Sequence, residues 1–181
     1  DQGGPNAGAL LARSISFHFL ENGVYEQRRN ASEAEYIAQL VRALLLRETK
    51  LSVGIVAFSE AQQTEIEEAL ARLADEDSDF GPRLEAEFTR EENDQFCGLF
   101  VKNLENVQGD ERDIVILSTT YGRDEKGKFH RRFGPLLQPG GGRRLNVLIT
   151  RARQEIHLVT SIPRESLTGT LETVRKELLK R

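Results

Sequence analysis

Arginines are concentrated near the C-terminal end of the chain, where residues 143–153 read Arg-Arg-Leu-Asn-Val-Leu-Ile-Thr-Arg-Ala-Arg. A guanidinium group is always charged at neutral pH, and its planar fork donates paired hydrogen bonds to phosphate oxygens. Phosphoryl transfer is accelerated by cations that are positioned where negative charge develops on the γ-phosphate. The arginines of this stretch are therefore candidates for contacts to the phosphate groups of a nucleotide. The alternative role for these side chains, Arg151 included, is a surface salt bridge.

The charge of the chain is unevenly distributed, although the formal net charge is only -4. Residues 60–94 contain 13 Asp and Glu against 3 Lys and Arg, whereas residues 120–153 contain 9 Lys and Arg against 2 Asp and Glu. The basic segment suits a surface that faces phosphates, because Lys and Arg neutralise phosphate charge and release counterions. A solvated loop with incidental arginines has the same composition, so charge alone does not identify a partner.

The strands that must position these arginines follow from the apolar pattern. An alternating apolar run predicts a strand at 14–20. Continuous apolar runs predict further strands at 53–58, 99–101, 114–117 and 156–159. Continuous runs are typical of strands that are buried on both faces of a parallel sheet. Because amphipathic helical patterns separate the strands, we predict an α/β fold with right-handed crossovers and helices on both faces.

The predicted helices are marked by caps and helical spacing. Ser32 and Glu35 form a capping-box pattern before an amphipathic helix, and Ser59 is the predicted cap of the next helix. A third helix carries the arginines after a loop at 121–142, in which the three glycines at 140–142 form a flexible tip. A final amphipathic helix is predicted after Pro163, with its apolar stripe at Leu167, Leu171, Val174, Leu178 and Leu179.

The chain is predicted to hold one domain. We assign residues 1–13 to an N-terminal extension and residues 14–181 to the domain itself. Residues 75–94 are acidic and contain Gly-Pro, so we interpret them as an excursion that leads to an irregular strand near 84–88. The sequence contains no internal repeat and no low-complexity tract.

Motifs that hold nucleotide phosphates are missing from the sequence. It contains neither a G-x-x-x-x-G-K-[ST] loop nor a G-x-G-x-x-G turn, and no predicted strand ends in paired acidic residues that would hold magnesium. The glycines at 140–142 lack the following Lys and Ser or Thr that phosphate and magnesium binding require. We therefore expect the chain alone not to hydrolyse ATP.

Two stretches together resemble a known family. Val-Gln-Gly at 107–109, followed by Glu111, Asp113 and an apolar strand, is similar to motif V of superfamily 1 helicases, and residues 143–153 resemble motif VI. Residues 53–62 resemble motif IV through their position upstream. The most similar branch is the up-frameshift-type helicases, together with large bacterial helicase-related proteins. The resemblance implies a RecA-like C-terminal lobe that closes on an N-terminal lobe around ATP and Mg2+, both held mainly by that other lobe.

The same resemblance implies roles for individual residues. Arg151 corresponds to the arginine finger, Glu111 to a contact with the nucleotide sugar, and Gly109 to a position where the backbone approaches the nucleotide. Gln62 and Arg144 complete the expected ATP-binding set, with no metal ligand among them. Arg144 and Arg153 are expected to orient motif VI and to join the two lobes, and a plain surface role is equally open for both.

Nucleic-acid contacts are implied for four polar residues between the third and fourth sheet strands of the chain. These residues are Asn103, Glu105, Asn106 and Gln108. Gln108 is expected to connect the nucleotide and nucleic-acid sites, whereas the other polar side chains are equally suited to capping a short helix. The expected partner is single-stranded nucleic acid, with DNA favoured over RNA.

One position departs from the family pattern. Gln63 stands where up-frameshift-type helicases carry an arginine that approaches the γ-phosphate. A second interpretation is therefore a nucleotide-sensing or structural lobe that does not hydrolyse ATP. A third is a small α/β nucleic-acid-binding module that uses the loop at 123–132, where the aromatics Tyr121, Phe129 and Phe133 accompany cations. The aromatics are also suited to pinning this loop to the core, and we favour that role for them.

Composition limits the remaining possibilities. The chain lacks methionine and begins at Asp1, so we expect it to be part of a longer protein. A single cysteine, Cys97, excludes an internal disulfide, and the three histidines are scattered in the sequence, as is typical of packing or surface residues. No apolar run is long enough to span a membrane and no signal peptide is visible, which favours the cytoplasm.

Overall fold

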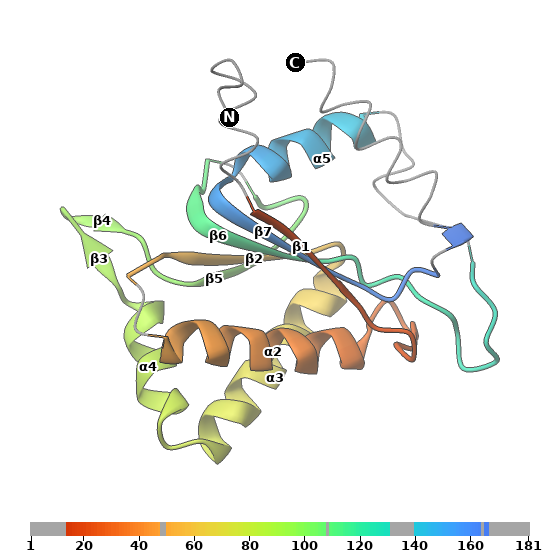
Figure 1. The fold of residues 1–181 in the computed structure, drawn as a ribbon, viewed down its shortest axis with the longest axis horizontal. Coiled ribbons are helices and arrows are strands. Elements are labelled where there is room, and N and C mark those ends of the chain that lie inside the picture. Colours follow the sequence, from red (N-terminus) through yellow and green to blue (C-terminus); the bar gives the residue numbers. More distant parts are fainter. Residues whose placement is uncertain (1–13, 48–49, 108, 131–139, 164, 167–181) are drawn as a thin grey trace.

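Five parallel strands form the central sheet of the protein, as Figure 1 shows. The computed structural model describes residues 14–47, 50–107, 109–130, 140–163 and 165–166. The strands are β1 (Ser14–Phe19), β2 (Val53–Ala57), β5 (Phe100–Asn103), β6 (Arg112–Ser118) and β7 (Ala152–Thr160). Their order is β1-β7-β6-β2-β5, and every pairing is parallel. The predicted α/β fold with a parallel sheet is confirmed.

Helices cover both faces of the sheet (Figure 1). One face carries α2 (Ala31–Leu46), α3 (Glu60–Glu76) and α4 (Phe80–Phe88), and the other carries α5 (Gly141–Thr150). Each face has its own hydrophobic cluster, one centred on α2 and α3 and the other beneath α5. This double burial is the physical reason for the continuous apolar runs in the strands.

All strands begin at one edge of the sheet and end at the other, and these are called here the N-terminal edge and the C-terminal edge. The N-terminal edge lies on the left of Figure 1, and α5 runs back toward it from the opposite side. The first residues of β6 and β7, Arg112 and Ala152, are paired there. Helix α5 therefore delivers its last residues, and Arg151 after them, to the start of β6.

The N-cap of the first helix lies two residues before the predicted one. Asn30, in extended backbone conformation, accepts a hydrogen bond from the backbone N–H of Glu33, whereas Ser32 lies inside α2. The prediction of a Ser32–Glu35 capping box was therefore wrong, because the pair Asn30 and Glu33 has the same spacing and takes its place. Ser59 does cap α3, accepting from the backbone N–H of Gln62 at 3.1 Å.

The acidic excursion contains a helix where we predicted a strand. Residues 80–88 form α4, in which Phe80 and Leu84 are both buried at helical spacing. Asp77 accepts hydrogen bonds from the backbone N–H groups of Asp79 and Phe80, and Pro82 falls in the first helical turn, where its missing N–H has no cost. A hairpin of β3 (Glu91–Glu92) and β4 (Gln95–Phe96) follows at the N-terminal edge.

The three glycines at 140–142 are not simply a loop tip. Gly140 is the N-cap of α5 with a φ of 91°, and the helix begins at the next residue. A left-handed conformation of this kind favours glycine, which has no Cβ.

Within the described ranges, none of the helices is both long enough and apolar enough to cross a membrane.

Candidate functional site

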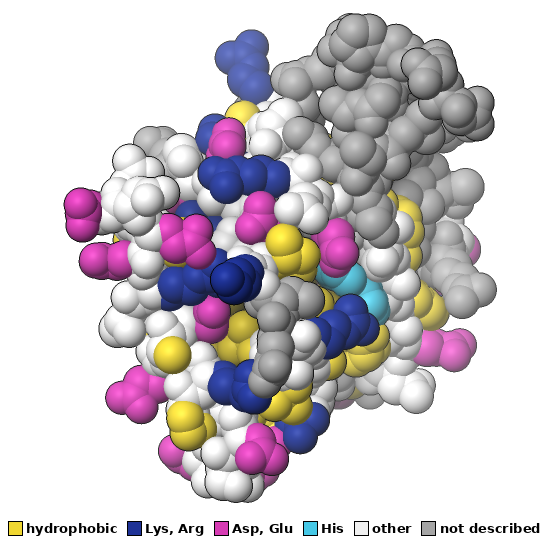
Figure 2. Space-filling view, turned by 60° about the vertical axis from the view of Figure 1, so that its left-hand side comes forward, with side chains coloured by type: hydrophobic (Ala, Val, Ile, Leu, Met, Phe, Trp, Pro, Cys, Tyr) yellow, Lys and Arg dark blue, Asp and Glu magenta, His cyan; other side chains and the backbone are white. Residues whose placement is uncertain are grey.

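The N-terminal edge brings together several residues for which the sequence predicted nucleotide contacts. Arg151 and Glu111 each lie next to Arg112, since the Arg112 N–H donates to the Arg151 carbonyl at 3.0 Å and Glu111 directly precedes β6. Arg153 pairs with the Glu111 carboxylate at 3.5 Å, and both side chains are about half exposed. Figure 2 turns this edge toward the viewer, with Lys and Arg side chains gathered among Asp and Glu. Arg151, Arg153 and Glu111 thus share one open edge of the domain.

Arg151 is held partly inside the protein. It is the C-cap of α5, and its own N–H donates to the Leu148 carbonyl at 3.1 Å. Its side-chain Nε is buried and has no hydrogen-bond partner among the described residues. A buried donor without an acceptor costs about 1–3 kcal/mol. The Arg151 side chain is therefore left with unused donor capacity among the described residues.

Gly109 is shaped for a close approach to its backbone. It has a φ of 75°, a conformation in which glycine is favoured, and a Cβ added there would meet no atom within 4 Å. The space beside its backbone is thus open, as the predicted nucleotide contact requires. Gln108, the neighbouring predicted residue, lies outside the described residues.

Arg144 lies on α5, the helix for which Arg151 is the C-cap. It is exposed and precedes Arg151 by seven residues, which is close to two helical turns, or about 10 Å along the axis. The two side chains therefore lie on the same side of α5. Contact of both with one nucleotide stays a prediction.

Gln62 is placed away from this group, at the start of α3 near the C-terminal edge. Its side chain is fully buried, and its Oε1 accepts from the Asn30 N–H at 2.7 Å. Its Nε2 donates to the Asn30 carbonyl at 3.0 Å and to Ser118 Oγ at 3.2 Å. Contact with a nucleotide would require these internal hydrogen bonds to break.

The predicted nucleic-acid residues also lie at the C-terminal edge. Asn103 ends β5, and its side chain accepts from the Glu105 N–H at 3.0 Å while donating to Gln63 Oε1 at 3.1 Å. Glu105 and Asn106 follow and are exposed. Asn103 thus caps the turn that presents two exposed polar residues. The segment from Asn103 to Arg112 then connects this edge to the N-terminal edge.

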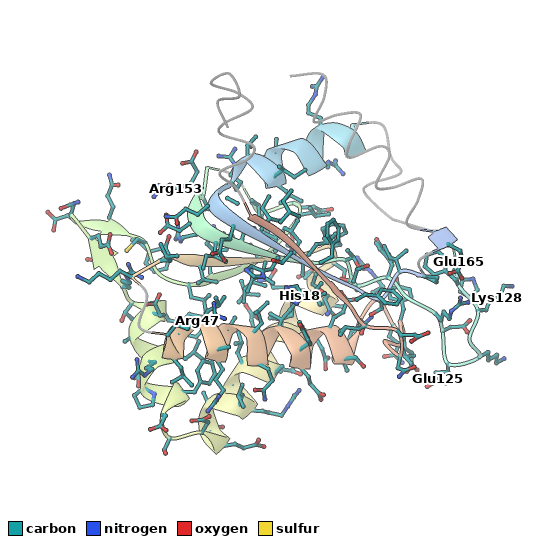
Figure 3. The ribbon with its side chains drawn as sticks, in the orientation of Figure 1. His18, Arg47, Glu125, Lys128, Arg153 and Glu165 are labelled. Carbon is teal, nitrogen blue, oxygen red and sulfur yellow. The ribbon has the colours of Figure 1, made fainter. Side chains whose placement is uncertain are left out.

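The basic loop after β6 is attached to the core by its aromatics. Tyr121 is buried and its ring lies 5.4 Å from that of Tyr25, while Phe129 packs against the cluster beneath α5. Arg123 pairs with Glu165 at 2.6 Å. Tyr121 is therefore not a surface for stacking bases, and Arg131, Arg132 and Phe133 lie outside the described residues. Figure 3 shows Lys128, Glu125 and Glu165 at the opposite end of the sheet from Arg153.

Two histidines that are scattered in the sequence meet in the structure. His18 Nε2 and His157 Nδ1 are 2.9 Å apart, across the paired strands β1 and β7, and His157 Nε2 lies 3.0 Å from the Glu155 carboxylate. Both histidines are packing residues, because His18 also contacts the Tyr36 hydroxyl. In the described part of the chain, no group of three or more His, Cys, Asp and Glu is arranged to hold a metal ion.

A buried polar network, which sequence reasoning missed, lies beneath the C-terminal edge. The Glu33 carboxylate is fully buried and accepts from four donors at 2.9–3.0 Å, namely Asn30 Nδ2, Ser118 Oγ, Thr120 N–H and Ser161 Oγ. The network joins the start of α2 to the ends of β6 and β7. The available signal was Asn30 three residues before Glu33, at the spacing of a capping box.

Ionisation of Glu33 is expected to make stability depend on pH. Burial raises the pKa of Glu33 from 4.5 to about 7, although hydrogen bonds from Thr120, Ser118 and Ser161 act in the opposite direction. Because the folded state then binds the proton more tightly than the unfolded state, this contribution is fully present below pH 4.5 and is lost as pH rises through about 7. Urea unfolding of the 181-residue chain at several pH values should show a free energy of unfolding that falls across this window.

Glu33→Gln serves as the comparison for this pH dependence. The amide keeps the size of the carboxyl group but does not titrate, so the Glu33-dependent part of the slope should disappear. Gln62→Glu is unsuitable as a control, because it adds a second buried carboxyl group to the same network. An identical slope in wild type and Glu33→Gln would show that another group causes the pH dependence.

Comparison with known proteins identifies the family of this chain. A family profile described as an AAA domain matches residues 14–162. A Mycoplasma genitalium protein named "Uncharacterized ATP-dependent helicase MG140" is 37% identical over 160 residues, covering 87% of this chain and 13% of that protein. A Mycoplasma pneumoniae protein named as the MG140 homolog is 39% identical over 144 residues, covering 78% of this chain and 12% of that protein. The chain thus spans about an eighth of the length of these curated relatives. With the five-stranded parallel sheet, the match confirms the predicted RecA-like fold.

Proposed function

This chain belongs to the AAA domain family of ATP-dependent helicase-like proteins, and we propose that it is the C-terminal motor lobe of a superfamily 1 helicase or translocase. The observation that carries the proposal is the grouping of Gly109, Glu111 and Arg151 at the N-terminal edge. In the proposed motor, this edge closes on an N-terminal lobe that holds ATP and Mg2+. Mg2+ would neutralise charge on the nucleotide phosphates.

Each residue of the group has a defined task in this proposal. The Arg151 guanidinium donates hydrogen bonds to the γ-phosphate and stabilises the charge that develops during transfer. The exposed Glu111 carboxylate accepts hydrogen bonds from the nucleotide sugar, and the open backbone at Gly109 allows the nucleotide to approach. Arg153, by pairing with Glu111, limits the positions available to that carboxylate.

Coupling to nucleic acid is proposed to run through the segment from Asn103 to Arg112. Its first part presents the exposed side chains of Glu105 and Asn106, and its last part carries Gly109 and Glu111. One short segment therefore joins the proposed strand-binding surface to the proposed nucleotide-binding edge. Closure around ATP would move both together and would convert nucleotide binding into movement along a single strand, for which we favour DNA.

The departure at Gln63 is the reason to consider an alternative in which the lobe senses nucleotide without hydrolysis. Gln63 hydrogen-bonds to Asn103 near the C-terminal edge, whereas Arg151 stands at the N-terminal edge. In this domain the side chain at position 63 thus serves the proposed strand-binding turn, and its loss of charge leaves the Arg151 group intact. We therefore favour the hydrolytic motor.

An ATPase assay tests this proposal. The full-length protein that carries this domain should hydrolyse ATP faster when single-stranded nucleic acid is added. The 181-residue chain by itself should show no appreciable turnover, because its sequence has no phosphate-binding loop. Robust turnover by the chain alone would contradict the proposal that a second lobe completes the site. Nucleotide binding without turnover in the full-length protein would support the sensing alternative.

A further inference from the structure

Arg112 is a charged residue buried at the start of β6. Its exposed fraction is 5%, and its guanidinium carbon lies 4.9 Å from the centroid of the Phe100 ring and 5.4 Å from that of Phe96. Burial of a guanidinium has a substantial desolvation cost, which aromatic faces offset only in part. Among the described residues, Arg112 makes no ion pair with a carboxylate within 4.0 Å. Its side-chain hydrogen bonds go to main-chain carbonyl groups, and the Asp110 carboxylate favours its charge from a longer distance.

The carbonyl partners of Arg112 belong to separate segments. Its Nε donates to the Gly98 carbonyl at 2.9 Å, and its terminal NH1 donates to the Glu111 carbonyl at 2.8 Å. Its backbone N–H donates to the Arg151 carbonyl at 3.0 Å. Arg112 therefore joins the Gly98 turn, which follows β4, to Glu111 and Arg151. These two residues are the ones proposed to contact the nucleotide sugar and the γ-phosphate.

Gly98 gives this connection a firm anchor. A Cβ on Gly98 would lie 2.0 Å from the Glu87 carbonyl, so only glycine allows the chain to pass so close to the end of α4. The neighbouring Leu99 N–H donates to the same Glu87 carbonyl at 3.0 Å. Because backbone fixes Gly98 on that side, its carbonyl is a stable acceptor for Arg112 on the other side.

We propose that the Arg112 side chain is a positioning group that fixes the main chain of Glu111 against the Gly98 turn, and so sets where the proposed sugar contact lies. The inference rests on the proposed function of this edge. Even a complete buried ion pair can often be replaced by apolar side chains of similar volume with a neutral or stabilising effect, and Arg112 lacks the carboxylate partner of such a pair among the described residues. Stability alone therefore does not account for a guanidinium that two carbonyl groups hold between two aromatic rings.

The test uses Arg112→Met in the full-length protein, with steady-state ATP hydrolysis measured at saturating single-stranded nucleic acid. Loss of the bond to the Glu111 carbonyl should raise KM for ATP by roughly tenfold, which corresponds to one charge-assisted hydrogen bond. The effect should appear mainly in KM, because a sugar contact acts in the ground state and the transition state alike. Arg112→Lys keeps the charge but has no fork that bridges two carbonyls, so its KM should stay near that of Arg112→Met.

Arg90→Met is the matched control. Arg90 also holds the hairpin, through the Lys50 carbonyl and the carboxylates of Glu87 and Glu92, but it has no bond to the nucleotide-facing residues. It should leave KM for ATP unchanged. Thermal unfolding of the 181-residue chain should show Arg112→Met within a few degrees of wild type, so that a KM effect reports on position and not on folding.

The outcomes separate this inference from the proposed function. An inactive wild-type protein would refute the proposed function. An active wild type whose KM is unchanged in Arg112→Met would overturn only the role of Arg112. Equal rises of KM in Arg112→Met and Arg90→Met would also overturn it, because they would show a general loosening of the hairpin. As an activity-free readout, amide hydrogen exchange at residues 109–113 should accelerate in Arg112→Met and not in Arg90→Met.

Discussion

Replacing Arg151 with alanine is expected to lower nucleic-acid-stimulated ATP turnover of the full-length protein by roughly 10³-fold or more, since arginine fingers contribute on that scale. Arg151 is the C-cap of α5, and its buried Nε lacks an acceptor among the described residues, so the side chain has donor capacity that these residues leave unused. Turnover at saturating ATP is the measurement, with circular dichroism to confirm that the variant is folded.

Two further variants make the Arg151 prediction specific. Arg151→Lys should restore little turnover, because an ammonium group keeps the charge but loses the planar fork. Arg143→Ala removes an exposed guanidinium from the same helix and should leave turnover near the wild-type value. A folded Arg151→Ala protein with normal turnover would refute the finger assignment and would favour the non-hydrolytic alternative.

Phe80→Ala is expected to destabilise the domain by about 3–5 kcal/mol, the usual cost of deleting a large buried aromatic side chain. Phe80 is fully buried and belongs to the hydrophobic cluster between α2, α3 and the sheet face that these helices cover. Its removal would leave a cavity where α4 meets that cluster. Urea unfolding of the 181-residue chain should show a lower midpoint with an unchanged slope.

Phe88→Ala is the matched control, since Phe88 ends the same helix but is 43% exposed. Its expected cost is within about 1 kcal/mol, because most surface substitutions change stability little. Comparable losses in the two variants would contradict the view that Phe80 anchors α4 to the core.

The sheet was predictable from the sequence, whereas α4 was not. The run in β2 and the run at 114–117 within β6 are almost entirely apolar, and burial on both faces is the simplest physical cause. In α4 only Phe80 and Leu84 are buried among acidic neighbours, so the helical period had too few members to be recognised. The Gly-Pro pair contributed to the prediction of an excursion with an irregular strand, although a proline in the first turn interrupts no helical hydrogen bond.

The sequence predicted less of the candidate site than of the sheet. Family resemblance, and not periodicity, pointed to Glu111 and Arg151, and the β6–β7 register explains why they lie close together. Arg112 was not predicted to have a role, because its partners are main-chain carbonyl groups, which no residue type in the sequence marks. Glu33 was missed for a similar reason, since a buried carboxylate is recognisable only from the donors that surround it.

The position of β1 in the sheet affects how this domain is made on the ribosome. In the described sheet β1 has a single neighbour, β7, and their pairing joins Ile15 to Ile156. At synthesis rates of 5–20 residues per second, the first strand waits on the order of ten seconds for its partner. During that time Ile15 and Phe17, which stay about half exposed even when the domain is folded, are available to other nascent chains. A polypeptide that stalls before β7 would therefore carry an unpaired apolar strand, the kind of segment that chaperones bind and aggregates recruit.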